Sequence, residues 1–220
     1  MAACSLALVA GGAAATFSEA RPYLYASGEA DKLAAFAEGG IAPGLSVLSA
    51  RVLLDDCHGA MTSLRALTEP PAVRANVARG CAGLAHVVTA QMPTYSHGWY
   101  VAARSALVQA DPSAMNAALV LSARTGPAEL WLAALRVGLG EQALETLSAQ
   151  ALAGHERDLA LLASARRGVE ALAPRYLADA DFRERLVRLL EAEPPARQRT
   201  FVNEIRRALA LLEERRGGAR

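Results

Sequence analysis

The sequence of 220 residues is poor in aromatic and β-branched side chains. Phe, Trp and Tyr make up 5% of the chain and only two isoleucines occur, although 53% of the residues are hydrophobic. Sheets favour β-branched and aromatic residues, whereas Ala, Leu, Arg and Glu favour helices. The composition therefore predicts an all-α fold, in a chain long enough to bury a core.

The sequence also lacks a charge imbalance. The formal net charge is +1, so no global field attracts nucleic acid. Lys32 is the only lysine, and from Glu156 onward Arg alternates with Asp and Glu. Such alternation is typical of solvated helix faces. We therefore expect no nucleic acid among the partners.

Catalytic and metal-binding motifs are missing too. The chain has no GxxxxGK[ST], GxSxG or HExxH pattern, and its four histidines lack metal-ligand spacing. In "DDCHG", Cys57 and His58 are adjacent on a helix and point about 100° apart, so they do not pair. In "HERD", His155 and Asp158 share a helix face, but solvation of a helix start explains them better. The sequence predicts no enzyme, no cofactor and no metal, with an all-α enzyme of unknown reaction as an alternative.

The amino-terminal region contains no charge from Ala2 to Phe17, and Arg21 follows. This run is similar to the hydrophobic part of a signal peptide or anchor. However, no Lys or Arg precedes it, and a membrane span needs about 20 residues. We prefer an exported or membrane-tethered segment, with a buried helix as the alternative. Residues 1–43 are thus predicted as an apolar segment plus linker, and residues 44–220 as one α-helical domain.

Apolar spacing and breaker residues divide the rest of the chain into helices. Pro174 is expected to stop one helix, and Asp181, with Glu184 three residues later, to cap the next. The predicted helices cover residues 30–37, 45–67, 72–91, 96–109, 112–124, 155–172 and 196–214, with two more beginning near Trp131 and Asp181.

A long hairpin is predicted around Glu69. Cys57 lies twelve residues before Glu69 and Cys81 twelve residues after it, each on the apolar stripe of its helix. Residues at equal distances from the turn lie side by side in an antiparallel hairpin. We therefore expect Cys57 and Cys81 to face each other, as a disulfide in an oxidising compartment and as packed thiols in the cytosol.

The stretch from Pro93 to Pro127 reads as helix, turn, helix, turn. The two prolines are 34 residues apart, and each is followed by a tryptophan, Trp99 or Trp131. Asp111 suits a helix cap, with Pro112 at the first helical position. Small residues lie between these positions, namely Ala102, Ala103, Ala117 and Ala118.

This unit resembles a divergent tetratricopeptide repeat in its length and in those positions. The usual Gly and Tyr of the first helix are replaced by Ala103 and Ala106. The resemblance implies antiparallel helical hairpins, stacked as a right-handed solenoid of about eight to ten helices. It makes Pro93, Trp99, Pro127 and Trp131 structural repeat positions, with the tryptophans chiefly in the core.

Repeat solenoids bind peptides on the surface lined by the first helix of each unit. The candidate partner-binding residues near that surface are His97, Tyr100, Arg104, Asn116 and Arg136. The expected function is a non-enzymatic scaffold that binds a protein partner in the bacterial envelope, for example in polysaccharide or secretion assembly. A cytoplasmic regulatory adaptor is the alternative.

Overall fold

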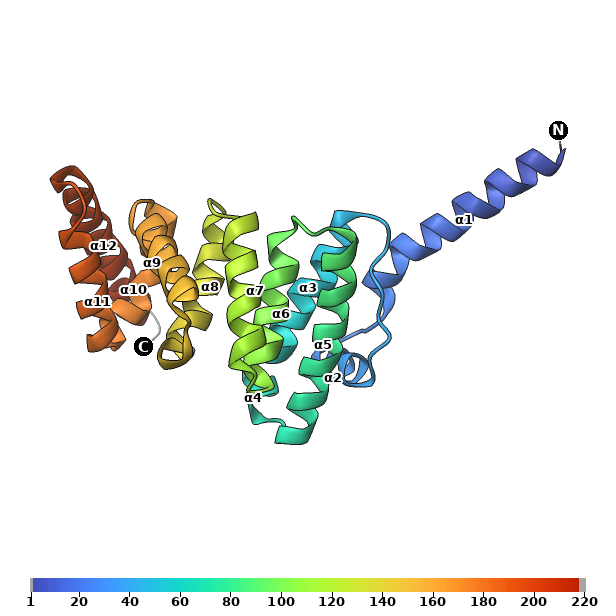
Figure 1. Cartoon of the computed structure of the whole chain (residues 1–220), viewed down its shortest axis with the longest axis horizontal. Helices are drawn as coiled ribbons and strands as arrows, with labels where there is room; N and C mark the ends of the chain where they lie inside the picture. Colours follow the sequence, from blue (N-terminus) through green and yellow to red (C-terminus); the bar gives the residue numbers. More distant parts are fainter. Residues whose placement is uncertain (1, 218–220) are drawn as a thin grey trace. The chain divides into compact units, whose positions relative to one another are not determined.

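The protein is all-α. The computed structural model describes residues 2–217, with side chains described from residue 9 onward except those of residues 212 and 215–217. Within that range it contains twelve α-helices, one 3-10 turn and no strand (Figure 1). The all-α prediction is confirmed, and the number of helices exceeds the eight to ten expected. The chain divides into two compact units, residues 1–125 and 126–220.

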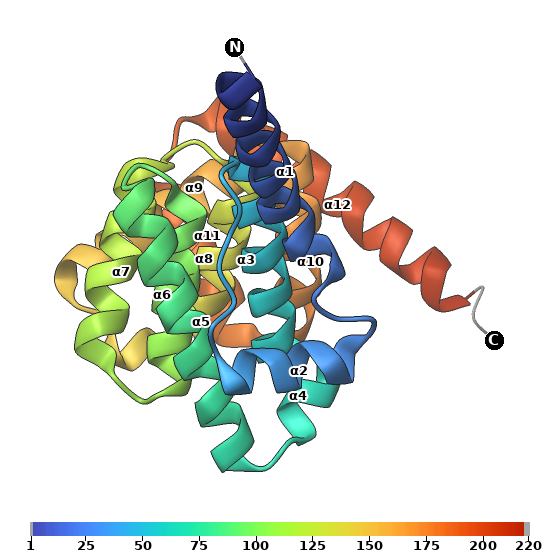
Figure 2. The same cartoon turned by 90° about the vertical axis from the view of Figure 1, so that its right-hand side faces the viewer.

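Unit 1 holds seven helices. In it α6 packs against α5 and α7, α2 lies on α5, and α3 contacts α1, α2, α5 and α6 (Figures 1 and 2). Its buried core comes mainly from Leu and Val of α3 and α5, with Val101 and Met115. The helices are α1 (Ala2–Leu24), α2 (Glu29–Glu38), α3 (Val47–Thr62), α4 (Leu64–Thr68), α5 (Pro71–Gln91), α6 (Ser96–Val108) and α7 (Pro112–Thr125).

Unit 2 holds five helices around its own core. Helix α10 is central, because it packs against α8, α9, α11 and α12. The core includes Leu162, Val169, Phe182, Leu186 and Phe201. The elements are α8 (Leu130–Gln142), the 3-10 turn η1 (Leu144–Thr146), α9 (Ala149–Ala163), α10 (Arg166–Ala178), α11 (Ala180–Glu191) and α12 (Pro195–Gly217).

Side-chain caps begin several helices, because the first N–H groups of a helix have no partner within it. Ser46, Ser63 and Ser148 each accept a hydrogen bond from the backbone N–H three residues later. Asp179 caps α11 by accepting from the N–H of Phe182 at 2.9 Å. The prediction of Asp181 as this cap is therefore wrong by two residues.

Three expected helix boundaries also differ. The predicted helix 45–67 is interrupted at Ser63, whose extended backbone starts α4. The predicted helix 155–172 is two helices, α9 and α10, that meet near Ser164. Pro174 lies inside α10 rather than after it. Its neighbours Leu172 and Ala173 are buried in the unit 2 core, so tertiary packing holds the helix through the proline.

The segment expected to be a linker belongs to unit 1. Leu33 and Phe36 of α2 are buried against α5. The backbone of Phe36 approaches Gly80 so closely that a Cβ on Gly80 would lie 1.8 Å from the Phe36 carbonyl oxygen. The packing therefore divides the chain at residues 125 and 126 rather than at residues 43 and 44.

Candidate functional site

Cys57 and Cys81 form a disulfide between α3 and α5. Their Cα atoms are 5.7 Å apart, and both side chains are fully buried. The structure thus places in contact the two cysteines that lie at equal sequence distances from Glu69. A buried disulfide cannot offer Cys57 as a nucleophile.

Beside the disulfide, α3 and α6 enclose a cluster of polar side chains, His58, His97, Tyr100 and Asp55. The hydroxyl of Tyr100 lies 3.0 Å from Nδ1 of His58, and the rings of Tyr100 and His97 stack at 6.2 Å. Nε2 of His97 is 3.7 Å from Oδ1 of Asp55. The sequence analysis considered the segment "DDCHG" and the stretch after Pro93 separately, and the structure makes them neighbours.

Burial keeps the two histidines and Tyr100 of this cluster uncharged. Desolvation lowers the pKa of His97 to about 3, with smaller effects from His58 and Arg51. It also lowers the pKa of His58 and raises that of Tyr100 to about 12. Two neutral imidazoles and a neutral phenol at neutral pH stabilise the α3–α6 contact by hydrogen bonding and stacking.

The residues expected to bind a partner are mostly inside the protein. His97, Tyr100, Arg104 and Arg136 are buried, so the expectation that they line an exposed surface is wrong. The reason in α6 is helical phase, since residues 97, 100 and 104 share the face that contacts α3. Asn116 is half-buried, and its side-chain amide donates to the carbonyl of Pro112 at 2.7 Å.

The repeat positions show a real local similarity in the turns before α6 and α8. Pro93 and Pro127 each lie three residues before the first helical residue. The N-cap residues Tyr95 and Glu129 have nearly equal dihedrals, with φ −84°, ψ 97° and φ −83°, ψ 94°. Trp99 and Trp131 are not equivalent, because they are the fourth and second residues of their helices. The indole of Trp99 donates to the carbonyl of Pro93 at 2.8 Å, whereas Trp131 is 41% exposed.

Three of the small residues expected at repeat positions, Ala102, Ala117 and Ala118, line a groove on unit 1. It has a volume of about 510 Å³ and lies along α6 and α7. Its walls are mainly alanine methyl groups, with Trp99 and Leu121 as the large apolar side chains. Such a groove offers little beyond van der Waals contact.

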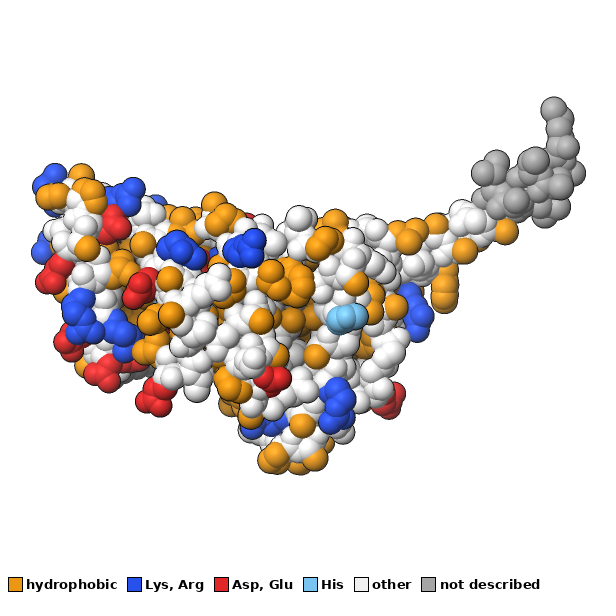
Figure 3. Space-filling model, in the orientation of Figure 1, with side chains coloured by type: hydrophobic (Ala, Val, Ile, Leu, Met, Phe, Trp, Pro, Cys, Tyr) orange, Lys and Arg blue, Asp and Glu red, His pale blue; other side chains and the backbone are white. Residues whose placement is uncertain are grey.

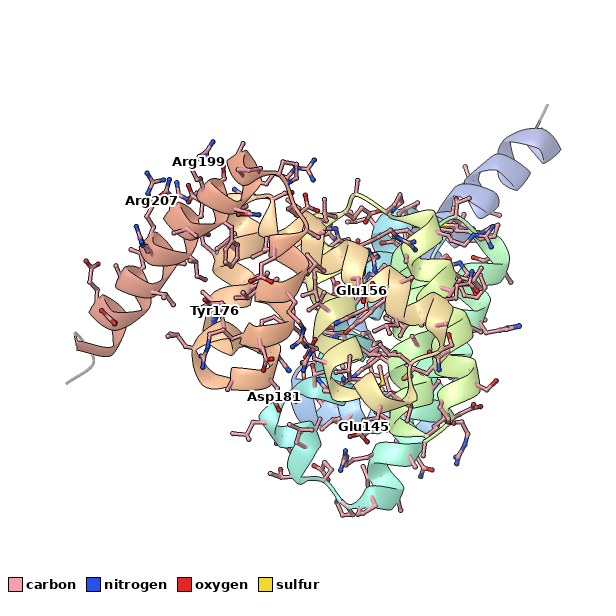
Figure 4. All side chains as sticks on the ribbon, turned by 60° about the vertical axis from the view of Figure 1, so that its left-hand side comes forward. Glu145, Glu156, Tyr176, Asp181, Arg199 and Arg207 are labelled. Carbon is pink, nitrogen blue, oxygen red and sulfur yellow. A yellow bond between two sulfur atoms is a disulfide. The ribbon has the colours of Figure 1, made fainter. Side chains whose placement is uncertain are left out.

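Unit 2 contains a larger groove of about 660 Å³, which we call the leucine groove. It runs between the η1–α9 segment and α11. Its lining combines apolar side chains with charges of both signs, including Glu156, labelled in Figure 4. The lining residues are Leu144, Leu152, His155, Glu156, Leu159, Arg185, Arg188, Leu189, Ala192 and Glu193.

The polar floor of the leucine groove is organised by Glu141, whose side chain is fully buried at the end of α8. Nε2 of His155 lies 2.8 Å from Oε1 of Glu141, and Arg185 donates to Oε2. Arg175 is 3.6 Å from the same oxygen. One carboxylate therefore joins α8, α9, α10 and α11.

His155 and Asp158, the residues of the "HERD" segment, face different partners. His155 turns to Glu141, while both oxygens of Asp158 accept hydrogen bonds from Arg136 at 2.7 Å. Among the described residues, no group of three or more His, Cys, Asp or Glu side chains could hold a metal ion.

Sequence reasoning missed Glu141 and Arg185. The available signal was that Glu141 is the only charged residue between Arg136 and Glu145. A lone acid at the end of an apolar helix is buried only if it is paired.

Comparisons with known proteins add no relative: no family model, no curated protein and no solved structure matches the chain. In the part of the chain that the structure describes, every helix is too short or too polar to cross a bilayer.

Proposed function

We propose that this protein is a non-enzymatic helical scaffold that binds a protein partner through the leucine groove of unit 2. The observation that carries the proposal is the lining of this groove. Four leucines supply apolar surface, and charged side chains surround them. Grooves of this kind between helices accept the apolar face of an amphipathic helix.

One unpaired group in the groove specifies the chemistry of the partner. Arg185 is engaged by Glu141, and its Nε is enclosed by protein atoms, out of reach of a bound peptide. Glu156 is exposed and makes no ion pair with any described residue. A bound peptide can supply a basic side chain to Glu156. We therefore assign the groove to an amphipathic segment with leucine-like side chains and at least one Lys or Arg.

The remaining polar lining residues are engaged within unit 2, which supports binding rather than catalysis. His155 is held by Glu141, Arg188 lies 2.7 Å from Glu184, and Glu193 lies 2.8 Å from Arg197. A general base needs a free nitrogen or oxygen directed at a substrate. Nδ1 of His155 has no hydrogen-bond partner, but it packs against Gly140, where a Cβ would lie 2.6 Å from it.

The fold proposed for the protein is a tetratricopeptide-like solenoid of antiparallel hairpins. The matching turns at Pro93 and Pro127 support it. The buried disulfide supports placement in an oxidising compartment such as the bacterial envelope, with assembly of polysaccharide or secretion systems as the setting. A cytoplasmic adaptor is the competing proposal, and the oxidation state of Cys57 and Cys81 in cells separates the two.

Site-specific photo-crosslinking tests the partner. Benzoylphenylalanine replaces Leu152 in the full-length chain, expressed in cells of the source organism. Leu152 is 37% exposed in the groove, whereas Val187 and Leu177 are 38% and 39% exposed outside it and serve as matched controls. We expect an adduct at position 152 alone, and mass spectrometry should map it to an apolar segment that carries a basic residue.

An acidic substitution in the groove provides a second test. Leu152→Glu should reduce the yield of a crosslink from position 189 at least about tenfold, because it replaces an apolar contact with the partner by a charge. Leu177→Glu should leave that yield unchanged. Adducts of equal yield at positions 152, 177 and 187 would contradict the proposal, as would a mapped segment that is acidic and polar.

A further inference from the structure

The amino-terminal part of unit 1 exposes an unusual amount of apolar surface. Val9 and Phe17 of α1 are each 71% exposed, and no residue from Ala2 to Ser18 carries a charge. Figure 3 shows hydrophobic side chains along the described part of α1, on the face that is drawn. A helix that is apolar all round is stable when buried in a core or in a membrane.

A second exposed apolar group lies at the start of α3, in Leu45, Val47 and Leu48. Leu45 is 79% exposed, and Val47 and Leu48 are both more than half exposed. These residues surround the cap residue Ser46. They form no part of the buried core of unit 1, so their apolar character is not explained by folding.

The two groups are joined by hydrogen bonds. The carboxylate of Glu19 accepts from the backbone N–H of Ser46 at 2.7 Å and from its hydroxyl at 2.6 Å. Gly44 packs against the same turn of α1, since a Cβ there would lie 3.0 Å from the Ser18 carbonyl oxygen. The base of α1 is thus fixed beside the start of α3.

The order of residues after the apolar run indicates lipid rather than a protein surface. Glu19, which is bound to Ser46, is the first charged residue after the uncharged stretch, and Arg21 and the half-exposed Tyr23 follow it. Basic and aromatic residues at the end of an apolar segment are typical of the boundary between hydrocarbon and water.

We infer that α1 and the start of α3 together form a surface that contacts a lipid bilayer. Helix α1 supplies the apolar segment, Arg21 and Tyr23 lie at the headgroups, and Leu45, Val47 and Leu48 enter the outer part of the same leaflet. Unit 1 is then held close to the membrane by two segments, rather than hanging from α1 alone. This inference is independent of the leucine groove on unit 2.

Flotation of the full-length protein with vesicles tests the inference. The probes are vesicles of phosphatidylcholine alone and of phosphatidylcholine mixed with phosphatidylglycerol. We expect flotation with both, with little dependence on salt, because apolar contact supplies most of the binding. Changing Leu45, Val47 and Leu48 together to Ser should lower the partition coefficient more than about tenfold.

The matched control changes Leu64 and Leu67 of α4 to Ser, since these leucines are 80% and 50% exposed elsewhere in unit 1. This variant should float like the unchanged protein. Circular dichroism and the intact disulfide confirm that both variants fold. The inference fails if the unchanged protein stays with the aqueous fraction. It also fails for α3 if the triple variant floats as well as the control, or if sedimentation without lipid shows that a second copy covers the surface.

Discussion

Arg136 and Asp158 form a two-point ion pair inside unit 2. Nε and Nη2 of Arg136 each lie 2.7 Å from one oxygen of the Asp158 carboxylate, and both side chains are almost fully buried. Nη2 also donates to the carbonyl of Gly126 at 3.2 Å. The pair connects α8 to α9 and fixes the chain just before the turn at Pro127.

Breaking this pair on one side should destabilise unit 2 strongly. Arg136→Met leaves a buried carboxylate and should cost about 3–5 kcal/mol, whereas Arg136→Met with Asp158→Leu should cost less, because no lone charge remains. Urea unfolding followed by Trp131 fluorescence in a Trp99→Phe background measures the loss. The exposed pair Arg166–Glu170 is the control, and Arg166→Met should change stability by under about 1 kcal/mol. A single variant as stable as the double variant would contradict this account of the pair.

The disulfide makes a separate prediction for unit 1. Cys57 and Cys81 are 24 residues apart, and closing a loop of that length in the unfolded chain contributes about 3 kcal/mol. Cys57→Ala with Cys81→Ala should therefore lower the stability reported by Trp99, in a Trp131→Phe background, by about that amount. The stability reported by Trp131, in a Trp99→Phe background, should not change. Equal losses at both tryptophans would show that the bond acts on the whole chain.

Helices were predictable from the sequence because their apolar faces and breakers are local. The residue spacing locates α5, α6 and α7 to within two residues at each end. It fails at Pro174, where buried neighbours outweigh the proline, and at Ser63, which ends one helix and caps another. Those outcomes depend on packing from distant segments, which a local pattern does not contain.

The candidate site was less predictable than the fold, for a physical reason. Periodicity places Tyr100 and Arg104 on one face of α6, but it does not say whether that face meets solvent or α3. The Cys57–Cys81 pairing needed only the symmetry of one hairpin. Glu141, by contrast, gathers His155, Arg175 and Arg185 from three other helices, and nothing in its own neighbourhood specifies them.

The contact between α2 and α5 should be sensitive to a single methyl group. A Cβ at Gly80 would overlap the carbonyl of Phe36, while a Cβ at Gly83 on the same helix meets nothing within 4 Å. Gly80→Ala should destabilise unit 1 by about 1–3 kcal/mol through overpacking, and Gly83→Ala should stabilise it by about 0.5–1 kcal/mol through helix propensity. Thermal and urea unfolding of the two variants measure this difference of sign. If both variants gain stability, α2 does not pack on Gly80 in solution.

His97 should make unit 1 sensitive to mildly acidic pH. Burial lowers its pKa to about 3 from an ordinary 6.5, so below pH 6.5 the unfolded chain takes up a proton that the folded chain does not. Stability should therefore fall as pH falls from 6.5, by about 1.4 kcal/mol per pH unit from this group. His97→Gln should weaken the pH dependence of unfolding reported by Trp99, and the part due to His58, whose pKa burial also lowers, should remain. His86→Gln, at an exposed histidine, is the matched control for the substitution itself.

Glu141 should control the acid sensitivity of unit 2 in a lower pH range. Burial acts to raise its pKa, but the hydrogen bond and charge of His155, together with Arg185, outweigh burial and lower the pKa below its ordinary 4.5. The unfolded chain therefore binds the proton first as pH falls. The stability that Glu141 contributes is complete above pH 4.5 and is lost as pH falls through the folded pKa.

Glu141→Gln should thus lower the stability of unit 2 at pH 6 and weaken its dependence on pH below 4.5. Unfolding reported by Trp131 measures both effects, and Glu170→Gln, on the exposed pair with Arg166, is the control. A variant that keeps the full acid sensitivity of the unchanged protein would mean that other carboxylates hold the four helices together. A variant that loses it would identify Glu141 as the group whose protonation loosens the floor of the leucine groove, so partner binding there should weaken over the same pH range.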